Sequence, residues 1–156
     1  MRKAVVIMGL AFGLQACQSE KAQGVAPTKC NLMEISPSKL PNGKPDVLSI
    51  DNPDSDTLPT AWQGPIHLKS SKGFSCDFAE DIGIISKPFL FDGNDRLFFT
   101  AYSGSNQNAF LLGIQECKIL WKSTTFGAGS ISSPAPSQLN VAGKNMLLKP
   151  DCVPAE

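Results

Sequence analysis

The alternation of short apolar runs with turn-forming residues is the feature that most constrains the fold. Groups such as Pro41-Asn42-Gly43 and Asp92-Gly93-Asn94 separate the runs and supply the backbone conformations that tight turns require. No window shows a helical period with caps, and 12 prolines and 13 glycines disfavour long helices. The sequence therefore predicts an all-β fold. The expected strands are residues 30–35, 46–50, 65–69, 74–78, 82–86, 88–91, 96–102, 108–114, 117–122 and 145–149.

The region from Ile82 to Lys122 has the most regular pattern, with four strands expected to form an antiparallel meander. Its two central strands flank Ser103 to Asn108, six small or polar residues without charge, which we expect to form a loop. Short strands at this spacing are typical of an all-β sandwich, a barrel or a propeller-like meander. The pattern does not repeat along the chain, so a true propeller is not supported.

The N-terminus has the layout of an export signal. Arg2 and Lys3 precede an uncharged apolar run that is too short to span a bilayer. The following Leu14-Gln15-Ala16-Cys17 resembles a bacterial lipobox, which predicts cleavage before Cys17 and lipid on that cysteine. Ordinary secretion with cleavage after Ala16 is the alternative. Residue 18 is not Asp, which in enterobacterial lipoproteins implies the outer membrane.

These features divide the chain into a signal peptide (1–16), a lipid-anchored flexible tether (17–29) and one β-rich domain (30–156). The chain has 14 basic and 14 acidic residues, and removing Arg2 and Lys3 leaves a net charge of −2. A charge so near zero argues against a nucleic-acid groove. The sequence thus predicts a periplasmic protein that touches the membrane only through its lipid.

Four cysteines remain when Cys17 is set aside: Cys30, Cys76, Cys117 and Cys152. An even number of cysteines in an oxidising compartment predicts two disulfides, which help a domain with a modest core. Three pairings are open. The wide spacing without C-x-x-C does not predict a zinc site.

Motifs for catalysis are weak, and we expect no enzyme and no cofactor. The one histidine, His67, lies in a β-like run, and no G-x-S-x-G motif surrounds a serine. The segment Phe126 to Ser130 has two glycines but lacks a nucleotide-binding motif, so it predicts a loop. The acids Glu80 and Asp81 are adjacent, which would direct them to opposite faces of a strand.

Residues 51 to 64 form a long irregular stretch with three acids, Asp51, Asp54 and Asp56. They lack the glycine and the terminal glutamate of an EF-hand, so a solvated acidic loop is favoured over a calcium site. Trp62 in the same stretch is expected to pack on the core.

The segment from Phe91 to Lys122 resembles periplasmic immunity proteins that protect bacteria from type VI secreted peptidoglycan amidases. The shared features are the Asp92-Gly93 turn, a strand ending at Tyr102, the sequence Ser103-Gly104-Ser105, and Cys117 opening the last strand. Upstream, Cys30, an Asp/Pro-rich stretch and Cys76 follow in the same order, so the resemblance covers roughly residues 30 to 122.

The resemblance implies a protein that binds and inhibits a papain-like Cys-His amidase. A Ser-Gly loop would enter the groove of the toxin, where a serine hydroxyl would hydrogen-bond to the catalytic histidine. By position this role goes to Ser105 and then Ser103, with Tyr102 and Asn106 as flanking contacts and Gly104 shaping the loop. A hydroxyl can donate and accept, so it can satisfy either state of an imidazole.

A lipoprotein inhibitor of C-type lysozyme is the alternative function. Such inhibitors are also small β proteins that use a Ser-Gly loop. They usually carry a tyrosine soon after the loop, where this chain has Phe110, and its one tyrosine precedes the loop.

Overall fold

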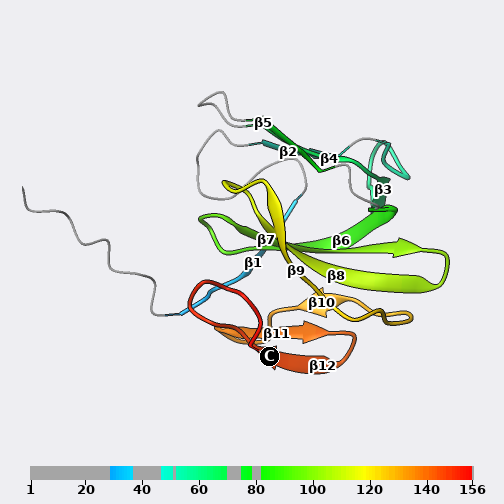
Figure 1. The fold of residues 1–156 in the computed structure, drawn as a ribbon. Coiled ribbons are helices and arrows are strands. Elements are labelled where there is room, and N and C mark those ends of the chain that lie inside the picture. The colour runs from blue at the N-terminus through cyan, green and yellow to red at the C-terminus, as the bar shows by residue number, and fades with distance from the viewer. Residues whose placement is uncertain (1–28, 37–46, 51, 70–74, 79–81, 156) are drawn as a thin grey trace, which may run out of the picture.

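The fold is all-β, as predicted. The computed structural model describes residues 29–36, 47–50, 52–69, 75–78 and 82–155, and within these ranges it has strands and no helix. The strands form three antiparallel sheets (Figure 1). None of the described segments is a helix long and apolar enough to cross a membrane.

A six-stranded sheet forms the centre of the molecule. Its strands follow the order β1-β6-β7-β8-β9, and β3 pairs with the first part of β6. The predicted meander is confirmed, because β6 to β9 are consecutive antiparallel neighbours. The bounds are β1 (Met33–Ile35), β3 (Ala61–Gln63), β6 (Ile84–Phe91), β7 (Arg96–Ser103), β8 (Asn106–Gly113) and β9 (Lys118–Lys122).

Two three-stranded sheets lie on opposite sides of the central sheet (Figure 1). One contains β2 (Val47–Ile50), β4 (Ile66–Lys69) and β5 (Ser75–Phe78). The other contains β10 (Ile131–Ser132), β11 (Gln138–Val141) and β12 (Lys144–Leu147). The architecture is therefore a three-layer sandwich, one of the arrangements that the sequence left open.

Each face of the central sheet carries its own hydrophobic core, because successive side chains on a strand point to opposite faces. Along β7, Leu97 and Phe99 belong to the core shared with Ile66 and Phe78 of the β2-β4-β5 sheet. The residue between them, Phe98, belongs to the core shared with the β10-β11-β12 sheet. A strand covered on both faces reads as a continuous apolar run, which explains Leu97-Phe98-Phe99.

Both predicted disulfides are present, and the structure selects one of the three pairings. Cys76 of β5 is bonded to Cys117 in the turn between β8 and β9, which ties one outer sheet to the central sheet. Cys30, just before β1, is bonded to Cys152 beyond β12, which ties the C-terminal segment to the start of the domain. All four cysteines are therefore structural.

Several predicted boundaries were wrong. Residues 82–86 and 88–91 are not two strands, because β6 runs through Pro88 with a shift of register between Ser86 and Leu90. The stretch 51–64 was expected to be irregular but contains β3. Trp62 of this strand is buried in the core as predicted, with 4 % of its surface exposed. Strands β10 and β11 were not predicted, because they have only two and four residues and half of these are polar.

Some predictions concern residues outside the described ranges. These are the signal peptide, the lipidation site Cys17, the tether up to residue 28, and the acids Asp51, Glu80 and Asp81. They remain predictions from the sequence.

Candidate partner-binding site

The predicted binding residues lie at the tip of the β7–β8 hairpin, but the loop is shorter than expected. The two strands pair continuously from Arg96 opposite Gly113 to Ser103 opposite Asn106. Only Gly104 and Ser105 lie outside the ladder, so the expected six-residue loop was wrong. Polar side chains do not prevent strand pairing. Here they lie at the end of the hairpin, where the residues are exposed to solvent.

The turn itself has the geometry of a two-residue hairpin. Gly104 has a φ of +62°, whereas Ser105 is not among the residues with positive φ. This combination is that of a type II′ turn, which matches the twist of paired strands and favours glycine at its first central position. The order Gly-Ser therefore follows from the backbone, and the turn needs no longer loop.

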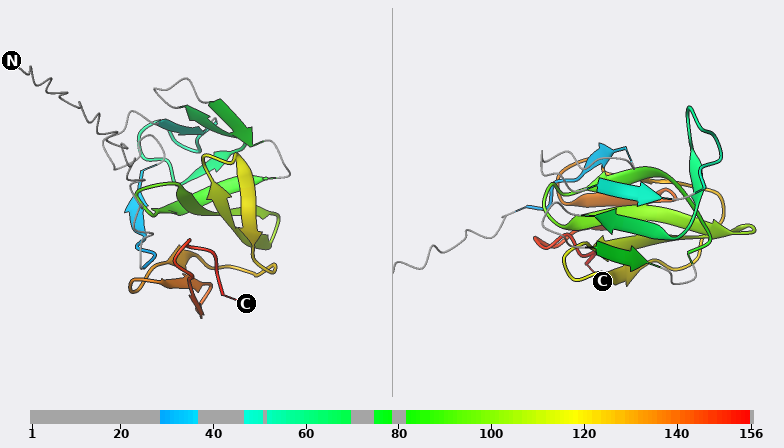
Figure 2. Two further views of the ribbon diagram at one scale, coloured as in Figure 1. Left: turned by 60° about the vertical axis from the view of Figure 1, so that its left-hand side comes forward. Right: turned by 90° about the horizontal axis from the view of Figure 1, so that it is seen from above.

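The tip presents only small groups to solvent. Ser103, Gly104, Ser105 and Asn106 are exposed, and Tyr102 is half-buried. A Cβ atom built on Gly104 would meet nothing within 4 Å. In the view from above, the hairpin projects beyond the other strands at one end of the molecule (Figure 2, right). The tip is therefore narrow, open and supported by a complete ladder.

A second segment of small residues lies beside the tip. Gln107, two residues past the turn, exchanges two backbone hydrogen bonds of 2.9 Å with Phe126. Phe126 opens the segment Phe126 to Ser130, which is a loop as predicted, and its residues 127–130 are exposed. The side-chain acceptor of Gln107, Oε1, is buried without a hydrogen-bond partner.

The sequence did not identify a recess at the base of the tip. Its lining includes Ser103 and Asn106 together with Asn108, Phe110 and Lys122. Strand periodicity alone could have placed Ser103, Asn106, Asn108 and Phe110 on one face of a hairpin. Lys122 comes from β9, and only the register of the β8–β9 pair brings it opposite Phe110.

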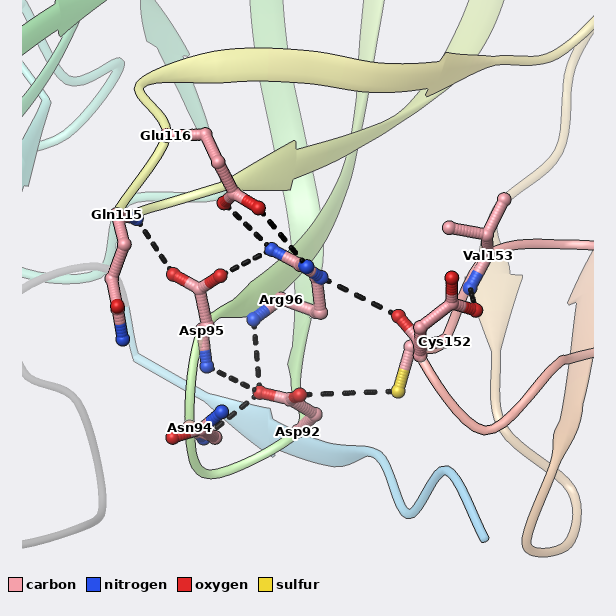
Figure 3. Close-up of polar contacts among 9 residues, drawn as sticks. Asp92, Asn94, Asp95, Arg96, Gln115, Glu116, Cys152 and Val153 are labelled. Carbon is pink, nitrogen blue, oxygen red and sulfur yellow. Dashed lines mark hydrogen bonds and ion pairs between the residues drawn. The ribbon is translucent and has the colours of Figure 1, made fainter. Parts of the chain in front are cut away.

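A polar network lies at the opposite end of the hairpin, where β7 begins (Figure 3). Asp92 Oδ1 accepts hydrogen bonds from the backbone N–H groups of Asn94, Asp95 and Arg96, at 2.8 to 2.9 Å. Asp92 Oδ2 lies 3.9 Å from Cys152 Sγ, a contact rather than a hydrogen bond, since a disulfide sulfur carries no proton. Asp92 thus shapes the β6–β7 turn.

Arg96 joins this turn to two other segments. Its guanidinium donates to both carboxylate oxygens of Glu116, at 2.8 and 3.2 Å, and also to Asp95 Oδ2. Arg96 Nε donates to the backbone oxygen of Asp151 at 3.4 Å. One side chain therefore holds together the β6–β7 turn, the β8–β9 turn and the C-terminal segment.

The pKa values of the two acids in the network, Asp95 and Glu116, are shifted in opposite directions. Burial raises the pKa of Asp95 to about 6, against the lowering effect of a hydrogen bond from the Gln115 N–H at 2.6 Å. The hydrogen bonds from Arg96 lower the pKa of Glu116 below its usual value. Two carboxyl groups whose pKa values are shifted in opposite directions are typical of acid–base catalytic sites, but ion-pair networks produce the same pattern. Here both carboxyl groups accept hydrogen bonds from Arg96, and Asp95 also accepts one from a backbone N–H group. These contacts favour a structural role.

Two other polar residues that the sequence analysis considered, His67 and Asp54, also form contacts with neighbouring side chains. His67 Nδ1 lies 2.8 Å from Asp77 Oδ1, its cross-strand neighbour on β5. Thr60 donates to both carboxylate oxygens of Asp54, which lowers the pKa of Asp54. Among the described residues no group of three or more metal-ligating side chains is brought together.

No protein-family model matches the chain, and no curated protein matches its sequence.

Proposed function

We propose that this chain is an immunity protein that binds a secreted peptidoglycan amidase and inserts the tip of the β7–β8 hairpin into the active-site groove. The observation that carries the proposal is the tip: two exposed turn residues, Gly104 and Ser105, on a fully paired ladder. The resemblance of the segment from Phe91 to Lys122 supplies the class of partner.

The shape of the tip suits a narrow groove. The four exposed residues from Ser103 to Asn106 carry no side chain longer than that of asparagine. The chain loses little conformational entropy when the tip binds, because the ladder already fixes its backbone. Pre-organisation of this kind offsets the small contact area that two residues can offer.

The chemistry of the tip suits a Cys-His site. Such enzymes activate the thiol by an adjacent histidine, so a group that engages the histidine removes the base. The Ser105 hydroxyl is exposed and forms no hydrogen bond within the described part of the chain. It can therefore donate to or accept from an imidazole. Inhibition then requires no catalytic group on this chain, and we propose a binding protein rather than an enzyme.

The position of the tip also suits an inhibitor anchored at its N-terminus. The described domain begins at Lys29 and enters β1, which pairs with Phe89 to Phe91 at the far end of β6. The tip lies beyond the other end of β6, where Ile84 pairs with Tyr102. A lipid on Cys17 would therefore be joined to the domain at the end opposite the tip, so that the attachment leaves the tip accessible.

The test begins with the reading frame next to the gene. We expect it to encode a small secreted Cys-His amidase, and purified residues 18–156 to inhibit that amidase at a ratio of one to one. Full hydrolysis of peptidoglycan in the presence of excess protein would overturn the proposal. Inhibition of a C-type lysozyme instead would replace it with the alternative function.

A further inference from the structure

The recess at the base of the tip is large enough for one side chain. It has a volume of about 180 Å³. Its lining combines the buried side chains of Ala101 and Phe110 with more polar residues, Ser103, Asn106 and Lys122. The recess therefore has an apolar part and a polar part, which together suit an amphipathic group.

The β-sheet register explains why the recess forms here. Ser103 lies opposite Asn106, and Phe110 lies opposite Lys122, so these side chains share one face of the sheet. Gly83 lies next to them with no side chain to fill the space. A Cβ at Gly83 would stand 2.5 Å from the backbone oxygen of Tyr102, closer than any side chain permits. Glycine thus keeps the recess open and the strands close.

The Lys122 ammonium group forms no ion pair with any described residue of the chain. It lies 5.3 Å from the centre of the Phe110 ring, which holds it beside the apolar part of the recess. The residues that line the recess include no acid.

Further hydrogen-bonding groups surround this charge. The side chains of Ser103 and Asn106 are exposed and form no hydrogen bonds with the described residues. Asn108 is different, because its Nδ2 donates to the backbone oxygen of Ser123 at 3.0 Å and to Thr125 Oγ1 at 3.3 Å. The recess thus offers a cation, a hydroxyl and an amide, with one neighbouring amide already held in place.

From this geometry we infer that the recess binds an acidic side chain of the partner protein. The carboxylate takes the hydrogen bonds of Lys122 and Asn106, and the methylene groups of the acid contact Phe110. This inference rests on the proposed function and adds a second contact to it, beside the groove that receives Ser105. The acid anchors the inhibitor in one orientation, because a charged pair of fixed geometry opposes other registers.

The test compares two lysines of the same strand, and its probe is the amidase encoded by the neighbouring reading frame. Lys122→Gln removes the charge at the recess, and the matched control Lys118→Gln removes a charge at the other end of β9. We expect Lys122→Gln to raise the inhibition constant about tenfold and to reduce its dependence on salt. Lys118→Gln should change neither, and both variants should unfold at the wild-type temperature.

A zero-length cross-link identifies the partner group directly. A carbodiimide joins an ammonium to a carboxylate only when they are in contact, so mass spectrometry should find Lys122 linked to one aspartate or glutamate of the amidase. Tight inhibition without this cross-link, and with Lys122→Gln as strong as wild type, would overturn the inference and leave the proposed function standing. An amidase that is not bound at all would overturn both.

Discussion

Arg96 binds Glu116 through two hydrogen bonds, at 2.8 and 3.2 Å, across the 20 residues that separate the start of β7 from the β8–β9 turn. The same guanidinium contacts Asp95, a buried residue whose side chain is 9 % exposed. This end of the hairpin is thus held by charge, whereas the other end carries the uncharged tip. The two ends lie about 24 Å apart along an eight-residue strand.

Replacing Arg96 by methionine should destabilise the domain without changing the tip. The substitution leaves the buried Asp95 carboxylate without its cation, and we expect a loss of about 2 kcal/mol in the free energy of unfolding. Urea denaturation of residues 18–156 measures this loss. Lys118→Met, at an exposed position of β9, is the control and should stay within about 0.5 kcal/mol of wild type. Equal stabilities of the two variants would show that the network contributes nothing.

The pH dependence of stability should report the buried acid. The pKa of Asp95 is about 6 in the folded protein, above its ordinary value of 3.8. The folded state therefore holds this proton more tightly, and the stability that Asp95 contributes at low pH is lost as the pH rises from about 4 to about 6. Glu116 acts in the opposite sense and at lower pH, because its pKa is lowered.

Asp95→Asn isolates this contribution. As the pH rises from 4 to 6, wild type should lose stability relative to the variant, by an amount on the order of 1 kcal/mol. Urea denaturation at several pH values across this range measures the difference. A constant difference between the two proteins would contradict the raised pKa of Asp95.

A bulky side chain at the tip should abolish inhibition and leave stability unchanged. Ser105 is exposed, so Ser105→Arg disturbs no core but places a long side chain where the groove must close on the turn. We expect wild-type thermal unfolding and no measurable inhibition of the amidase. Ser132→Arg, at an exposed position of β10, is the control and should inhibit fully. Full inhibition by Ser105→Arg would show that the tip is not the binding element.

Two glycines near the tip should respond differently to alanine. Gly104 has a positive φ but open space around it, so Gly104→Ala should cost about 1 kcal/mol through backbone strain alone. At Gly83 the new methyl would stand 2.5 Å from the Tyr102 oxygen, so β6 and β7 must separate, at a cost of about 2–3 kcal/mol. Chemical denaturation of both variants measures the loss of stability. A greater loss for Gly104→Ala than for Gly83→Ala would contradict the described packing.

The two disulfides should differ in what their removal costs. The bond between Cys30 and Cys152 spans 122 residues and that between Cys76 and Cys117 spans 41. The loop-entropy relation gives upper limits of about 5 and 4 kcal/mol for the two bonds. Paired Cys→Ala variants should therefore both unfold at lower temperature, with the Cys30–Cys152 pair affected more. The opposite order would indicate that local packing, rather than chain entropy, governs the effect.

Patterns within single segments were sufficient for much of the fold. The meander from Ile82 to Lys122 followed from apolar runs and turn residues, and Trp62 was correctly placed in the core. The length of the loop at Ser103 to Asn108 was wrong because composition reports exposure, whereas pairing depends on the neighbouring strand. Residues Asn106 to Asn108 are polar and exposed or half-buried, and they still form a regular ladder.

Local residue patterns were enough to predict an all-β chain and a small, uncharged hairpin tip, since each depends on residues close together in sequence. The number of cysteines was enough to predict two disulfides. Tertiary contacts decided the partner of each cysteine, the three-layer arrangement and the recess that brings Lys122 beside Phe110. These features join segments far apart in sequence, and they depend on the register and stacking of whole sheets. A shift of one residue in the β8–β9 register would send Lys122 to the other face, because side chains alternate with a period of two.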